Sequence, residues 1–458
     1  MKSTADTPLK DLNKAIVLRP LASAEESVRD GEARLLEAVG LAQALGLDVA
    51  GAEAAPLRQI SPRTYFGSGR VERLKVQSEE LGAGVIVVDA PLSPVQQRNL
   101  ETDIGSKVID RTGLILEIFG LRARTKEGKL QVELARQGYE RSRLVRTWTH
   151  LERQRGGLGK TGGPGETQIE LDRRIIADRI IRLKKDLEDV RRTRGLQRRA
   201  RSRAGLPAVV LVGYTNAGKS TLFNRLTQAG VLAKDMLFAT LDPTARQVKL
   251  PSGRAVIMSD TVGFISDLPH ELVESFRATL EAVTEADLLV HVRDIAHPQS
   301  EDQKADVLAV LAQLAKDAGG KSPPVLEAWN KIDLLDDATR IGRLRRAEAA
   351  SQGQGALPPV ALSAETGEGV DTLLAAIDRA AFSATRVITL TLSPDDAGRV
   401  RAQIAAHGKI VEESTDDDGN LTLRAELLVE DAARFAPLEP RPEELRPAAE
   451  EGFHVSRP

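Results

Sequence analysis

The sequence GYTNAGKS, Gly213 to Ser220, is the feature that most constrains what this chain can fold into. It follows the apolar run AVVLV and precedes TLFNRL, which predicts the first turns of a helix. A loop of the form GxxxxGK[ST] in that setting turns successive backbone N–H groups towards phosphate oxygens, and its glycines adopt dihedrals that a Cβ forbids. The stretch therefore predicts a P-loop domain with a mostly parallel sheet and flanking helices.

The end of this loop holds the residues expected to bind phosphates. Lys219 would place a positive charge near the β- and γ-phosphates, Ser220 offers a hydroxyl to Mg²⁺, and the following helix supplies the positive end of its dipole. The alternative is a chance match on an ordinary turn before a helix, which the flanking strand and helix disfavour. The predicted contacts are Gly213, Tyr214, Thr215, Asn216, Ala217, Gly218, Lys219, Ser220 and Thr221.

Three further motifs follow, each at the end of a predicted strand. DTVG contains Asp260, expected to hold Mg²⁺ through water, and Gly263, whose N–H can contact the γ-phosphate. In NKID the Asp333 carboxylate can accept the N1–H and 2-amino group of guanine, a donor pair that adenine lacks, which predicts GTP rather than ATP. In SAETGEG the Ala364 N–H can meet the guanine O6. The predicted contacts are Asp260, Thr261, Val262, Gly263, Asn330, Lys331, Asp333, Ser363 and Ala364.

A switch loop is expected between the P-loop and DTVG, at FATLDPT. Such a loop needs a threonine whose hydroxyl completes the Mg²⁺ shell and whose N–H touches the γ-phosphate, so that the loop is ordered only with GTP bound. Thr240 is the favoured candidate and Thr244 the competitor. The predicted nucleotide contacts of this loop are Phe238, Ala239, Thr240, Leu241 and Asp242.

Catalysis is assigned to Lys219, Thr240 and Gly263, and the metal to Ser220 and Thr240 directly. Ras-like proteins place a glutamine after the DxxG glycine to orient the attacking water, but Phe264 occupies that position here. A phenyl ring cannot hold a water by hydrogen bonding. Hydrolysis is therefore expected to be slow unless another residue or a partner orders the site.

A strongly basic segment, 121–205, precedes the P-loop: it contains 24 Lys and Arg against 11 Asp and Glu, a net charge of +13 in a chain of −2. Apolar residues recur at coiled-coil spacing on both sides of GGLGKTGGPGETQ, whose first ten residues hold six glycines and a proline. This pattern predicts an antiparallel helical hairpin with a glycine-rich tip. Its charge favours RNA as partner over the alternative, a solvated coiled coil with surface arginines.

Short apolar runs alternate with helical spacing in residues 1–120, which predicts a small α/β domain with a largely parallel sheet. YFGSGRVERL within it is a glycine turn opening a helix, and a connector is favoured over a phosphate site there. The GTPase domain is expected at 206–385. Residues 386–458 predict a small acidic βαββ appendage with a disordered tail.

Composition narrows the class and the metal. No apolar run approaches the roughly 20 residues that span a bilayer, and the N-terminal stretch lacks the apolar segment of a signal peptide, so a cytoplasmic protein is expected. The chain has no cysteine, which excludes disulfides and thiolate zinc sites. A bound metal is therefore expected to be a hard cation such as Mg²⁺ held by oxygen.

Together the motifs GYTNAGKS, FATLDPT, DTVGFI, NKID and SAETGEG, preceded by GGLGKTGGPGETQIELDRR in the basic hairpin, resemble those of the HflX GTPases, in the translation-factor-related class. The resemblance implies a cytoplasmic GTPase that binds the large ribosomal subunit, directs its N-terminal domain and hairpin towards the peptidyl-transferase region, and splits stalled or idle ribosomes. The family also has a hydrophobic residue after DxxG, so Phe264 fits it. Its C-terminal appendage varies.

Two other functions stay open at this point. One is a GTP-gated adaptor in ribosome assembly or RNA modification, which predicts association with an enzyme or precursor RNA and no subunit dissociation. The other is a scaffold with vestigial nucleotide binding, which the intact Lys219, Ser220, Thr240, Asp260 and Asp333 argue against. The chain is expected to act as a monomer on large-subunit rRNA through 121–205.

Overall fold

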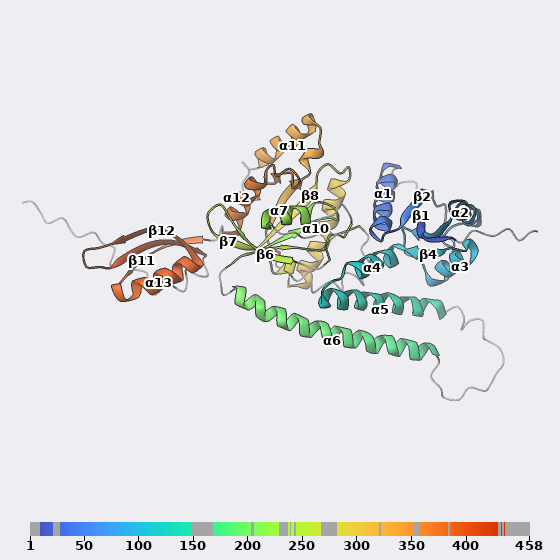
Figure 1. Ribbon diagram of the computed structural model, residues 1–458, viewed down its shortest axis with the longest axis horizontal. Coiled ribbons are helices and arrows are strands. Elements are labelled where there is room, and N and C mark those ends of the chain that lie inside the picture. The colour runs from blue at the N-terminus through green and yellow to red at the C-terminus, as the bar shows by residue number, and fades with distance from the viewer. Residues whose placement is uncertain are drawn as a thin grey trace, which may run out of the picture. The chain divides into compact units, whose positions relative to one another are not determined.

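A computed structural model gives the arrangement of most of the chain (Figure 1). It describes residues 10–21, 28–148, 168–202, 206–228, 237–238, 240–241, 244–266, 282–319, 322–350, 357–382, 385–428, 432 and 435. Contacts divide the chain into two compact units, which are Met1–Gly195, Ala208–Arg246 and Met258–Leu373 for the first, and Leu196–Pro207, Gln247–Ile257 and Leu374–Pro458 for the second. The predicted domain boundaries stay a prediction.

The N-terminal region of the first unit is a four-stranded sheet with helices. Its strand order is β2-β1-β3-β4 and its paired strands are parallel, as the alternating pattern predicts. The central strand β3 is buried along its whole length because helices pack on the sheet. The elements are β1 (Asp11–Leu21), α1 (Val28–Ala44), β2 (Asp48–Pro56), α2 (Ser68–Leu81), β3 (Ala83–Val88), α3 (Pro94–Ile104), β4 (Lys107–Asp110) and α4 (Arg111–Arg122).

Two long helices follow and form the predicted antiparallel hairpin, side by side in Figure 1: α5 (Lys126–Trp148) and α6 (Gln168–Ser202). The two helices pack against each other along the apolar seam that the sequence predicts. An ion pair of 2.8 Å between Arg179 and Glu133 joins the two helices beside it. The glycine-rich tip lies outside the described residues. The packed seam residues are Leu130, Leu134, Ile176, Ile180, Leu183 and Leu187.

The P-loop region is a six-stranded sheet of order β10-β9-β8-β5-β7-β6, and the four strands from β10 to β5 pair in parallel. Three sequence motifs follow the ends of the parallel strands β5, β9 and β10, so they share the carboxyl edge of these strands. A parallel bridge between Tyr214 and Phe264 brings the segment after β7 to the same edge. The elements are β5 (Ala208–Val212), α7 (Lys219–Thr227), β6 (Thr244–Lys249), β7 (Ala255–Asp260), β8 (Leu288–Asp294), α10 (Ser300–Asp317), β9 (Val325–Asn330), η2 (Ile332–Leu334), α11 (Asp337–Ala350), β10 (Val360–Ala361) and α12 (Val370–Ala381).

The C-terminal appendage has the predicted βαββ order, in an antiparallel sheet of order β11-β13-β12. Its elements are β11 (Thr385–Leu392), α13 (Pro394–His407), β12 (Gly408–Thr415) and β13 (Leu421–Leu428). Alternate residues of β11 and β13 bury against α13, as the period of a strand requires. The predicted tail lies outside the described residues. No helix within the described ranges is long and apolar enough to cross a membrane.

Candidate guanine nucleotide site

The P-loop wraps the start of α7 and holds its lysine inward. Gly218 caps the helix with φ of 89°, a conformation that disfavours residues with a Cβ. A Cβ there would also overlap the Asn330 side-chain nitrogen. Lys219 is buried, and its Nζ donates a hydrogen bond of 2.7 Å to the Tyr214 carbonyl. The loop is therefore closed around the lysine, as a phosphate cradle requires.

Burial sets the charge of this lysine. It lowers the pKa of Lys219 to about 8, and the nearby Asp260 carboxylate opposes the shift. Gly263 lies directly beside it, because a Cβ on Gly263 would stand 3.1 Å from the Lys219 Nζ and 2.8 Å from the Thr215 Cγ2. The DTVG main chain is thus brought against the P-loop, at the place where a γ-phosphate would meet both.

Three oxygens converge next to the lysine. The Ser220 Oγ lies 2.7 Å from the Asp260 Oδ2 and 2.7 Å from the Thr240 Oγ1. Asp260 is fully buried, which raises its carboxyl pKa, and among the described residues its Oδ1 has no hydrogen-bond partner. The competitor Thr244 lies in β6 instead. Hydroxyl and carboxylate oxygens with an unpartnered buried atom fit a hard cation such as Mg²⁺.

Phe264 is fixed by its main chain as well as its ring. Its N–H donates to the Gly213 carbonyl at 3.1 Å, and its carbonyl accepts from the Thr215 N–H at 2.7 Å, so the segment after DTVG pairs with the P-loop like a short strand. The phenyl ring is buried in a cluster with Phe238 and Leu241. It offers no hydrogen-bonding group to a water.

Asn330 joins the phosphate end of the site to the base end. It is buried, its Nδ2 donates to the Ala217 carbonyl at 2.9 Å, and its Oδ1 accepts from the Ala364 N–H at 2.8 Å. The Ala364 N–H proposed for guanine O6 therefore has an acceptor in the chain. Asp333 is exposed in η2, where its carboxylate is accessible to a base. Lys331 forms an ion pair of 2.8 Å with Asp294.

The other predicted contacts differ in exposure. Thr261 donates its hydroxyl to the Leu211 carbonyl at 2.7 Å, so its side chain holds the sheet rather than facing a ligand. Asn216 is exposed and Thr221 is half-buried at the start of α7. Ala239 and Asp242 lie outside the described residues. The remaining predicted contacts in the P-loop, in DTVG and in SAETGEG (called the SAE loop below) surround the same edge of the sheet, and their roles stay a prediction.

Sequence reasoning missed the residue that supports the base loop from α7. The Arg225 Nε donates to the Ala364 carbonyl at 2.7 Å, and its Nη2 donates to the Glu365 carbonyl. Asn330 and Arg225 thus hold opposite sides of the Ala364 residue. No local pattern marks Arg225, since 139 residues separate it from Ala364.

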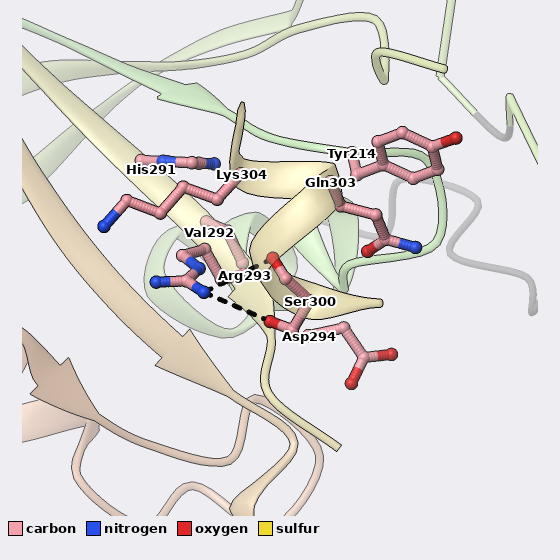
Figure 2. Close-up of a pocket in the computed structure, with 8 residues that line it drawn as sticks. All are labelled: Tyr214, His291, Val292, Arg293, Asp294, Ser300, Gln303 and Lys304. Carbon is pink, nitrogen blue, oxygen red and sulfur yellow. Dashed lines mark hydrogen bonds between the residues drawn. The ribbon is translucent and has the colours of Figure 1, made fainter. Parts of the chain in front are cut away.

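A small pocket lies behind the P-loop, between β8 and α10 (Figure 2). Tyr214 and His291 lie on opposite sides of it. His291 is buried, which lowers its pKa to about 4, and within the described residues its Nδ1 has no partner. Arg293 donates to the Ser300 carbonyl there at 3.3 Å. Tyr214 is the P-loop residue among those that line the pocket, and we assign no ligand to it.

Comparison with known proteins decides the family. Three family models match in succession: "GTP-binding GTPase N-terminal" over residues 32–120, "GTP-binding GTPase Middle Region" over 122–201 and "50S ribosome-binding GTPase" over 208–331. The GTPase HflX of Magnetococcus marinus is 50% identical over 407 residues, 89% of this chain and 90% of that protein. The chain belongs to the HflX GTPase family. The GTPase HflX of Escherichia coli is 43% identical over 83% of this chain and 86% of its own length.

The resemblance read from the motifs is thereby confirmed, and the P-loop GTPase fold with it. Membership in this family implies GTP hydrolysis. Among solved structures, a GTP-binding protein from Sulfolobus solfataricus in complex with GDP is 23% identical, with a TM-score of 0.43, and the match covers 81% of this chain and 99% of that one.

Proposed function

We propose that this chain hydrolyses GTP, binds the large ribosomal subunit and uses GTP-dependent switching to dissociate stalled or idle ribosomes. The observation that carries the proposal is the gathering of Thr240, Ser220, Asp260 and Gly263 around Lys219, on a chain whose basic helical hairpin immediately precedes the P-loop. A site assembled in this way can respond to a γ-phosphate. The hairpin is the element whose action that response would control.

In this proposal, water attacks the γ-phosphorus of GTP and the bond to the β–γ bridging oxygen breaks, giving GDP and phosphate. Lys219 binds the β- and γ-phosphates, and the Gly263 N–H donates to the γ-phosphate. Asp333 selects guanine by accepting from its N1–H and 2-amino groups. Mg²⁺, held by Ser220 and Thr240 and through water by Asp260, would neutralise phosphate charge. Phe264 cannot orient the water, so the reaction is slow until the ribosome orders the site.

The hairpin supports RNA as the partner. Its segment has a net charge of +13, which favours binding to a phosphate backbone. The packed seam of α5 and α6 makes a stiff arm, because 35 residues of α6 extend about 52 Å at 1.5 Å per residue. A monomer in the cytoplasm would use this arm to reach large-subunit rRNA that a compact domain surface cannot reach.

The test has two arms. GTP hydrolysis is measured with and without purified large subunits, and dissociation of whole ribosomes is followed by light scattering. We expect strong stimulation by large subunits and GTP-dependent dissociation; no stimulation would count against the proposal. Replacing 156–165 with a short turn should preserve GTP binding and abolish dissociation. If GTP binds but ribosomes stay intact while a precursor RNA or enzyme associates, the adaptor function is supported instead.

A further inference from the structure

A buried arginine of the N-terminal region reaches the segment that follows DTVG. Arg111, the first residue of α4, is 5% exposed. Its Nη1 pairs with the Asp89 Oδ1 at 2.5 Å, and its Nη2 pairs with the Glu37 Oε1 at 2.7 Å. The same Nη2 donates to the Ser266 carbonyl at 2.9 Å. Burial works to lower the pKa of Arg111, but the two carboxylates raise it, so the arginine stays charged.

Glu37 of α1 completes a closed network with the P-loop. The Tyr214 hydroxyl donates to the Glu37 Oε2 and accepts from the Ser266 N–H at 2.8 Å. The Ser266 Oγ donates to the Glu37 Oε1 at 3.2 Å. Both polar main-chain groups of Ser266 are therefore bonded, one to the P-loop tyrosine and one to Arg111. The network links the P-loop and the DTVG segment to the helices α1 and α4.

The same helix α4 also contacts the switch loop. Phe119 packs edge-to-face on Phe238, with ring centroids 4.8 Å apart. Phe238 is two residues before Thr240. The N-terminal region thus contacts all three loops that meet at the phosphates: the P-loop at Tyr214, the DTVG segment at Ser266 and the switch loop at Phe238.

Asp110, the residue before Arg111, binds α5, the first helix of the hairpin. Asp110 is buried, and its Oδ1 accepts from the Tyr139 hydroxyl of α5 at 2.8 Å. Arg143, one turn further along α5, pairs with the Asp110 Oδ2 at 3.4 Å. The junction between β4 and α4 therefore bonds the first arm of the hairpin through Asp110 and the nucleotide loops through Arg111.

We propose that Glu37 and Arg111 are positioning residues for the nucleotide switch: they hold the main chain at Ser266, and through it the DTVG loop, in the arrangement that receives a γ-phosphate, and so couple the nucleotide to the hairpin. This inference rests on the proposed function and adds the residues that transmit it. The network coexists with a Thr240 hydroxyl 2.7 Å from Ser220 and with Gly263 against Lys219. It therefore stabilises the closed arrangement of the loops.

The closed arrangement of the loops favours binding of a triphosphate over a diphosphate, because only a triphosphate has a γ-phosphate to accept hydrogen bonds from the N–H groups of the switch loop and of Gly263. Loosening the network should accordingly weaken the binding of GTP more than the binding of GDP. By linkage, the nucleotide must also act back on the network and on the hairpin junction to the same extent. Loss of the hydrogen bonds made by Glu37 is expected to lower the ratio of GTP-analogue to GDP affinity about fivefold.

The decisive variant is Glu37→Ala, because Arg111 keeps its ion pair with Asp89 and no buried charge is left unpaired. Affinities for a non-hydrolysable GTP analogue and for GDP are measured by calorimetry on the full chain. We expect the analogue to bind about fivefold more weakly and GDP to stay within about twofold. Glu32→Ala, an exposed carboxylate on the same helix, is the matched control and should change neither affinity. An unchanged affinity ratio in Glu37→Ala would overturn the inference.

A second readout follows the coupling itself. Amide hydrogen exchange over α5 should differ between the analogue and GDP in the wild type, and this difference should vanish in Glu37→Ala. Ser266→Ala, which removes one bond to Glu37, should shift the affinity ratio in the same direction by less. A nucleotide-dependent difference that persists in Glu37→Ala contradicts the proposal. A wild type that binds neither nucleotide contradicts the proposed function itself, so the two failures are distinguishable.

Discussion

Asn330→Ala tests whether the site is one connected unit. In the wild type both ends of the Asn330 amide are bonded within the protein, to the Ala217 carbonyl at 2.9 Å and the Ala364 N–H at 2.8 Å. The substitution leaves these two buried groups without partners, and each costs about 1–3 kcal/mol. Water entering the space that the side chain leaves would offset part of this. A net loss of about 3 kcal/mol corresponds to roughly 100-fold weaker GDP binding.

The assay is titration with a fluorescent GDP derivative, with thermal unfolding measured in parallel to show that the fold is retained. Gln313→Ala is the matched control, since it removes an amide whose hydrogen bond lies on the exposed surface of α10. We expect the control to bind as the wild type does. Binding by Asn330→Ala within about threefold of the wild type would refute the reasoning, because it would show that the P-loop and the SAE loop do not depend on this amide.

Three other substitutions test single residues of the P-loop region. Arg225→Ala should weaken GDP binding about fivefold, because it releases the SAETGEG loop, and Arg225→Lys should restore part of the affinity. Arg345→Ala, on the exposed face of α11, is the control and should have no effect. Equal GDP affinities of Arg225→Ala and the wild type by calorimetry would contradict this. Asp333→Asn should move preference from GTP towards xanthosine triphosphate, and unchanged guanine selectivity in competition binding would overturn the NKID assignment. His291, whose pKa burial lowers from 6.5 to about 4, contributes stability that is fully present above pH 6.5 and is lost as pH falls towards 4, by roughly 3 kcal/mol. The free energy of unfolding, measured by denaturant titration with Trp329 fluorescence, should therefore decrease less steeply with falling pH in His291→Gln than in the wild type. Parallel pH profiles of the two proteins would refute this prediction.

The parts of the fold that sequence reasoning predicted are those set by local patterns. The P-loop was predictable because its glycines, lysine and serine lie next to each other between a strand and a helix. The seam of α5 and α6 was predictable because apolar residues repeat along each helix. Strand β2 has no apolar run to mark it in the sequence, because most of its residues are small; it lies at the edge of its sheet, where it buries little apolar surface.

The supports of the site could not be predicted from one sequence. Arg111 lies 155 residues from Ser266, and Glu37 lies 229 residues from it. An arginine at the start of a helix and a glutamate in the middle of one are ordinary features, and only the tertiary fold brings them to the P-loop. The sequence favoured Thr240 over Thr244 but did not exclude Thr244. The fold separates the two, because it places the Thr240 hydroxyl beside Ser220 and Thr244 in β6.

The central claim is that the nucleotide at the P-loop controls engagement of the basic hairpin with the large ribosomal subunit. The most direct measurement is sedimentation of the full chain with purified large subunits, in the presence of a non-hydrolysable GTP analogue or of GDP. We expect the protein to sediment with the subunits in the presence of the analogue and to stay in the supernatant in the presence of GDP. Equal sedimentation in both nucleotides, or none in either, would contradict it.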